Sequence, residues 1–142
     1  MKFHPVSLLN KANPVKSHRF NSHPNSSLLV EVVIHPSAKC LNAFYHSRYK
    51  DEDDVHAFCE SSELTDKDEV QARIHFAAGA VSIPLVAHEV YHAVECCRKH
   101  HRFAAVADQN EEFMAETTGH IFNEAMKLFV HLKVSLDANH EW

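Results

Sequence analysis

Residues 82–101, SIPLVAHEVYHAVECCRKHH, form the most strongly predicted helix of the chain. Ser82 is a favourable N-cap, because its hydroxyl can accept a hydrogen bond from a backbone N–H group of the first turn. Pro84 is tolerated in that first turn. The apolar side of the helix is formed by Leu85, Val86, Ala93, Val94 and Cys97. This pattern predicts an amphipathic helix that ends near His101 and packs one side against a core.

Strands are predicted before this helix, at residues 27–35, 55–61 and 71–78. In the last of them Ala72, Ile74 and Phe76 alternate with Arg73 and His75, which is the period of a half-buried strand. Gly79 ends this strand. Residues 38–49 fit either a helix or a strand, residues 51–54 a turn, and residues 62–69 a polar loop. Residues 1–27 are predicted to be extended or loop-like, with one short strand at residues 2–9.

A second helix is predicted after a turn at residues 107–110, with Asn110 as its cap. Its core stripe consists of Met114, Ile121, Ala125, Phe129 and Leu132. Gly119 would let this helix approach the first one closely. Strands followed by two helices indicate an α+β domain, with a mixed or antiparallel sheet of three or four strands packed against both helices. The length of 142 residues suits a single domain over residues 1–142.

Composition and charge exclude several classes of protein. The net charge is −5 with neutral histidines, and the basic residues are scattered, so we expect no nucleic-acid partner. None of the four cysteines forms a C-x-x-C pair, which argues against a zinc ribbon or a disulfide framework. Free thiols suit a reducing compartment. No stretch has the length and apolarity of a signal peptide or membrane span, and we expect a cytoplasmic protein.

The candidate chemistry lies in H-E-V-Y-H, residues 88–92, which matches H-E-x-x-H. On a helix, positions i and i+4 share one face, so His88 and His92 can reach the same cation. Catalytic zinc takes three protein ligands and keeps one open position. Glu89, adjacent to the first ligand, can take a proton from attacking water and deliver it to a leaving amine. The motif therefore predicts a zinc site with Glu89 as general base.

The simplest alternative is a helix with two surface histidines and a solvated glutamate. Three fixed residues can occur by chance, and the chain has 14 histidines. The apolar flanks of the motif, with Glu89 as the single charge within LVAHEVYHAV, favour a functional site. Tyr91 points away from the two histidines by helix geometry and is interpreted as a packing residue.

A third ligand is expected from E-x-x-A-E, residues 112–116, on the second helix. The arrangement resembles the gluzincin metallopeptidases, including small ImmA/IrrE-like and phage-encoded peptidases, over residues 71–130. The resemblance implies that Glu112 is the third metal ligand and that Glu116 supports a ligand. The sequence departs from the family form in having Glu rather than Asp at position 116. Glu116 therefore stays an alternative ligand, and the remaining candidates are Glu111, Asp108 and a histidine such as His120.

The resemblance implies a zinc-dependent peptidase that acts on a protein or peptide. The strand at residues 71–78 would then pair with an extended substrate. The substrate carbonyl could be polarised by His75, Tyr45, His46, His100 or His101, although a surface position is the default for each. A second hypothesis is a zincin-like domain that binds zinc and a protein partner without cleaving it.

Overall fold

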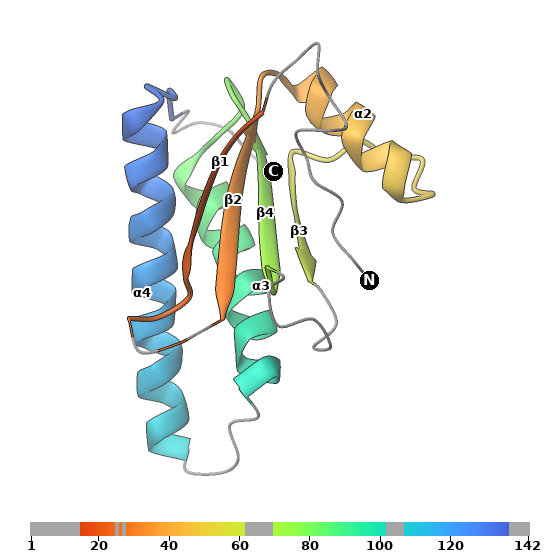
Figure 1. Cartoon of the computed structure of the whole chain (residues 1–142). Coiled ribbons are helices and arrows are strands. Elements are labelled where there is room, and N and C mark those ends of the chain that lie inside the picture. Colours follow the sequence, from red (N-terminus) through yellow and green to blue (C-terminus); the bar gives the residue numbers. More distant parts are fainter. Residues whose placement is uncertain (1–14, 25, 27, 62–69, 102–106, 137–142) are drawn as a thin grey trace.

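The computed structural model describes residues 15–24, 26, 28–61, 70–101 and 107–136, with all their side chains except those of residues 100, 101 and 107–110. Its elements are β1 (Lys16–Asn21), β2 (Leu29–His35), α2 (Ala38–Arg48), β3 (Ala57–Ser61), β4 (Ala72–Ala77), α3 (Ile83–His101) and α4 (Ala107–His131). The strand predicted at residues 2–9 and the loop predicted at residues 62–69 lie outside the described residues. The described chain confirms the α+β class, because four strands form one sheet and three helices pack against it (Figure 1).

The four strands form one mixed sheet in the order β1-β2-β4-β3. β2 runs parallel to β4, whereas β1 is antiparallel to β2 and β3 is antiparallel to β4. The sequence of β2, LVEVVIH, is rich in the β-branched residues that favour a pleated, buried strand. The predicted mixed sheet is therefore confirmed, with β1 and β3 at its edges.

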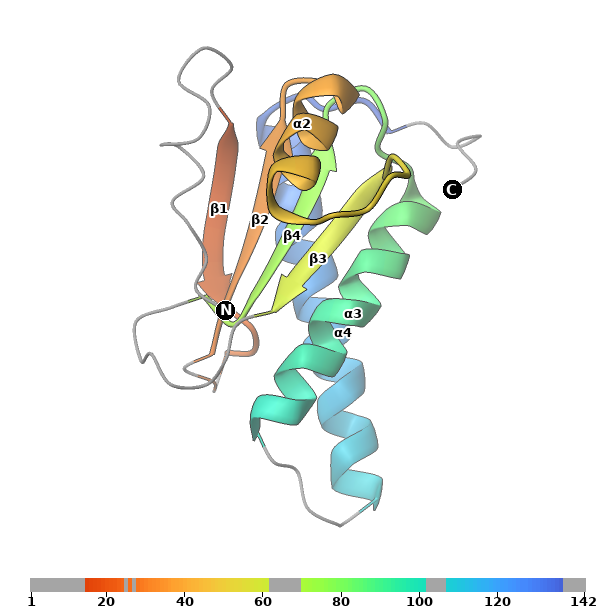
Figure 2. The ribbon, with the colours of Figure 1, turned by 90° about the vertical axis from the view of Figure 1, so that its right-hand side faces the viewer.

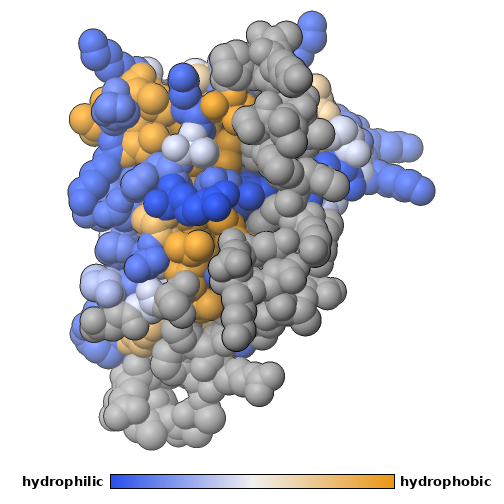
Figure 3. Space-filling model, viewed as in Figure 1, coloured by the Kyte–Doolittle hydropathy of each residue, from blue (hydrophilic) through white to orange (hydrophobic). Residues whose placement is uncertain are grey.

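Helices cover both faces of the sheet (Figure 2). α3 packs against β3 and β4, and α4 packs against α3 and β1 on that same face. Their core includes the alternate strand residues Val30, Val32, Ile34, Ala72, Ile74 and Phe76. α2 lies on the opposite face, where a smaller core contains Val33, Leu41, Phe44, Phe58 and Ala77. Figure 3 shows mainly hydrophilic side chains over the outer side of α4.

Two local signals place α3 where the sequence predicts it. Gly79 has a φ of 85°, which a glycine adopts without strain, and the chain turns here between β4 and α3. The Ser82 hydroxyl accepts a hydrogen bond from the backbone N–H of Leu85 at 3.3 Å, as expected of an N-cap. The ambiguous segment at residues 38–49 is a helix, α2, with Ser37 as its cap.

Four predictions from the sequence are wrong. The prediction of an extended or loop-like segment misses the pairing of β1 with β2, because KSHRFN has little strand character without β2 beside it. Asn110 does not cap α4, which begins at Ala107 because no glycine or proline interrupts the residues after it. Gly119 is exposed, and a Cβ atom there would meet nothing within 4 Å, so it permits no close helix approach. β4 is buried on both faces rather than half-buried, because α2 covers its polar side.

Other predictions are confirmed. Cys40, Cys59, Cys96 and Cys97 are free thiols. In the stripe of α4, Ile121, Ala125 and Phe129 are fully buried, and Met114 and Leu132 pack at its margin. None of the helices, over the residues described, is long and apolar enough to cross a membrane.

Removing the aromatic contact between α4 and the sheet should destabilise the protein strongly. Phe129 packs edge-to-face on Phe76, with ring centroids 5.3 Å apart. We expect Phe129→Ala to lower the free energy of unfolding by about 3–5 kcal/mol, as large-to-small core substitutions do. Val130→Ala is the matched control, because Val130 is 74% exposed, and it should change stability by less than about 0.5 kcal/mol. Urea unfolding measures the free energy of unfolding of both variants, and equal losses of stability in the two would contradict the assigned core.

Candidate functional site

The two motif histidines lie together on the solvent side of α3. Their Nε2 atoms are 3.2 Å apart, with His88 partly exposed and His92 exposed. Two nitrogens bound to a tetrahedral zinc at about 2.0–2.1 Å would be separated by about 3.3 Å. Desolvation and the neighbouring His92 lower the pKa of His88, which favours the neutral imidazole that a metal requires. The spacing thus suits two ligands of one cation.

Glu89 points into the protein beside this pair. It is 4% exposed, and its Oε1 lies 3.9 Å from Nε2 of His88. Its Oε2 is buried and has no hydrogen-bond partner among the described residues. Burial raises the pKa of Glu89 to about 7, which is in the range suited to a general base at neutral pH. The alternative of a solvated glutamate is therefore wrong.

The acids of α4 do not join this pair in the structure. Glu112 is exposed, and Glu116 accepts a hydrogen bond from Nε2 of His23 at 2.8 Å. His120 donates to the carbonyl oxygen of Asn21 at 2.9 Å, so this face of α4 contacts the β1–β2 connection. Glu111 is exposed, and the side chain of Asp108 is outside the described set.

A complete set of protein ligands is therefore not assembled. Within the described part of the chain, no group of three or more His, Cys, Asp or Glu side chains is arranged to hold a metal ion. The residues that are present fit part of a zinc site, namely two imidazoles and a neighbouring buried carboxyl group. Glu112 as the third ligand stays a prediction.

The other candidates from the sequence are separated from the motif. Tyr45 donates to Asp51 and His46 pairs with Asp54, both near the surface on α2. The side chains of His100 and His101 are not described. Tyr91 is 60% exposed, so its interpretation as a packing residue is wrong. It follows His88 by three positions and lies on the solvent side of α3.

Among the candidates to polarise the substrate carbonyl, His75 departs most clearly from the expected surface position. Its side chain is completely buried, on the face of β4 that is turned to α2 and away from α3. A signal was available in the sequence, because Arg73 and His75 occupy alternate positions of an otherwise apolar strand, and Glu31 is an acid within the apolar stretch of β2. Opposite charges on neighbouring strands can lie side by side on one face of a sheet.

Glu89→Gln provides a test of this electrostatic environment without any metal. The raised pKa means that the folded state holds a proton more tightly than the unfolded chain. The stabilisation that protonated Glu89 contributes to the fold is complete below about pH 4.5 and is lost as the pH rises through about 7. In metal-free protein, the free energy of unfolding of Glu89→Gln relative to that of wild type should increase by about 3 kcal/mol between pH 4.5 and pH 8. Urea unfolding at both pH values measures it, and a pH-independent difference would show that Glu89 is not desolvated.

In comparisons with known proteins, no protein-family model, no curated protein and no solved structure matches the chain.

Proposed function

We propose that the protein is a zinc-dependent peptidase with a small zincin-like domain, in which His88 and His92 bind the metal and Glu89 is the general base. The observation that carries this proposal is the geometry of α3. Two imidazole nitrogens lie 3.2 Å apart, and a carboxyl group that is 4% exposed lies directly beside them. A helix with two incidental surface histidines has no reason to bury the glutamate between them.

Zinc at this position would supply a Lewis acid that polarises a carbonyl group and makes water a better nucleophile. Glu89 would accept the proton of the water as its oxygen attacks the peptide carbonyl carbon, and would then donate it to the leaving amine. Burial supports this role, because a carboxyl group that is poorly solvated holds and releases a proton near neutral pH.

An extended substrate would lie along β3 rather than along β4. β4 is paired on both sides, by β2 and by β3, so the expectation that residues 71–78 add a substrate strand is wrong. β3 is at the edge of the sheet and packs against α3. Among the described residues β3 pairs on one side only, and its other backbone edge could accept a peptide as an added strand next to the motif helix.

The second candidate is a zincin-like domain that binds zinc and a protein partner without cleavage. One observation favours it: among the described residues, His88 and His92 are brought together without a third protein ligand. For the peptidase, Glu112 has to reach the metal from the start of α4, or Glu116 has to leave His23.

Metal binding and cleavage separate these candidates. We expect purified protein to bind one zinc ion, as measured by elemental analysis and calorimetric titration with Zn²⁺. His92→Ala should weaken binding at least about tenfold, because one of the ligand nitrogens is lost. His46→Gln, on the exposed side of α2, is the matched control and should bind as wild type does. Folded protein that binds no zinc would contradict the metal site.

Cleavage is tested by mass spectrometry on a mixed library of unstructured peptides. Glu89→Gln should keep zinc and lose at least about a hundredfold in cleavage rate. Retained cleavage in this variant would refute the assigned base, whereas zinc binding with no cleavage by wild type would support the silent domain. Glu112→Gln and Glu116→Gln, compared in the same titration, identify the acid that contributes to zinc affinity.

A further inference from the structure

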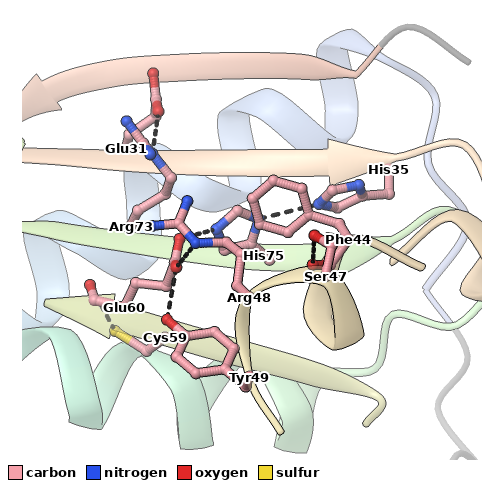
Figure 4. A network of polar contacts seen from close by, with 10 residues as sticks. All are labelled: Glu31, His35, Phe44, Ser47, Arg48, Tyr49, Cys59, Glu60, Arg73 and His75. Carbon is pink, nitrogen blue, oxygen red and sulfur yellow. Dashed lines mark hydrogen bonds and ion pairs between the residues drawn. The ribbon is translucent and has the colours of Figure 1, made fainter. Parts of the chain in front are cut away.

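A buried polar network lies between the sheet and α2, on the face away from the motif (Figure 4). It consists of Arg48 and Tyr49 at the end of α2 and of Glu60 on β3, His75 on β4 and His35 on β2. The carboxylate of Glu60 is at its centre and is 2% exposed. A charge in such a place is tolerated only when it is paired and hydrogen-bonded.

The contacts of Glu60 define where the protons are. Its Oε2 accepts a hydrogen bond from the Tyr49 hydroxyl at 2.6 Å and pairs with Nε of Arg48 at 3.1 Å. Its Oε1 lies 2.7 Å from Nε2 of His75, so that nitrogen must carry a proton and donate it. Glu60 is therefore ionised and is balanced by Arg48.

The two imidazoles continue the chain of hydrogen bonds. Nδ1 of His75 lies 3.0 Å from Nε2 of His35. In the neutral His75 this Nδ1 has a lone pair, so Nε2 of His35 donates to it. Nδ1 of His35 is then left with a lone pair that is buried and has no hydrogen-bond partner among the described residues. This atom is the one position in the two rings where another proton can be added.

The surroundings make that added proton costly. His75 is clamped between the rings of Phe58, at 4.3 Å, and Phe44 of α2, at 4.9 Å, and is shielded from water. Burial lowers the pKa of His75, and burial followed by the charge of His75 lowers the pKa of His35 to about 3. Nearby Arg73 adds a further positive charge and is itself paired with Glu31 at 2.6 Å.

We propose that these five residues form an acid-sensitive latch, the histidine latch, which holds the end of α2 on the sheet at neutral pH and releases it when the imidazoles are protonated. A proton added at Nδ1 of His35 can pass along the chain, so that His75 becomes an imidazolium facing Glu60. It then competes with Arg48 for the same carboxylate. The strands hold the other members in place by backbone pairing, whereas Arg48 and Tyr49 can leave with α2.

The direction of the pH dependence follows from the protonation states. Docked α2 keeps both histidines neutral, whereas released histidines regain their ordinary pKa near 6.5. Docking is therefore strongest above about pH 6.5 and weakens as the pH falls. Burial acts to raise the pKa of Glu60, but the hydrogen bonds from His75 and Tyr49 and the charge of Arg48 outweigh burial, so the pKa of Glu60 is lowered. Protonation of Glu60 therefore also weakens the docking of α2 as the pH falls. The latch requires no metal and is independent of the proposed peptidase.

Hydrogen exchange of the α2 amides, corrected for intrinsic rates, tests the latch. For one histidine, the protection of α2 should fall about 25-fold between pH 7 and pH 5. His35→Gln keeps a donor for His75 but cannot become charged, and its α2 should lose clearly less protection. His46→Gln is the control, because His46 is also on α2 but pairs with exposed Asp54, and it should respond as wild type does.

Two further measurements keep the test decisive if His35→Gln does not fold. Nitrogen-15 NMR of the wild-type rings should show both histidines neutral and protonated at Nε2 at pH 7. Glu60→Gln removes the partner of Arg48, and its α2 should already be weakly protected at pH 7. Unchanged protection of the α2 amides between pH 7 and pH 5, a doubly protonated His75 at pH 7, or wild-type protection in Glu60→Gln would each overturn the latch.

Discussion

The burial of β4 on both faces is the constraint on which the rest of the structure depends. β2 and β3 pair with its two sides, α3 lies against one face, and α2 against the other. A strand in this position has no contact with bulk water, so each of its polar side chains needs a partner within the protein. Arg73 pairs with Glu31 and His75 pairs with Glu60, which ties β4 to β2 and β3 through side chains as well as backbone.

The same strand positions the candidate metal site. β4 leads through the turn at Gly79 directly into α3, so the packing of α3 on β3 and β4 sets its rotation. That rotation carries Val90, Ala93 and Val94 into the core and leaves the two motif histidines at the surface. Glu89 falls between these two sides. It is buried without a hydrogen-bond partner for its Oε2 among the described residues, and the proposed role of general base rests on this environment.

Histidines occupy two opposite environments in this molecule. His88 and His92 are accessible and close together, which suits ligands that must accept a metal from solution. His35 and His75 are enclosed by aromatic rings, with their protons fixed by Glu60. The residue type alone does not distinguish these two environments. Exposure and the identity of the neighbouring donor or acceptor do, because they decide which protonation state is stable.

The sequence by itself determined the features that depend on local periodicity. Alternation predicted β4, the Ser82 cap and apolar spacing predicted α3, and the i, i+4 spacing placed His88 and His92 on one face, because these follow from backbone geometry within a few residues. Only the tertiary structure decided that β1 is a strand, that β3 rather than β4 is at the edge, and that His75 is buried. It also directed Glu116 towards His23 rather than towards the motif. These outcomes depend on contacts between segments far apart in the chain, and local spacing carries no information about which of them will meet.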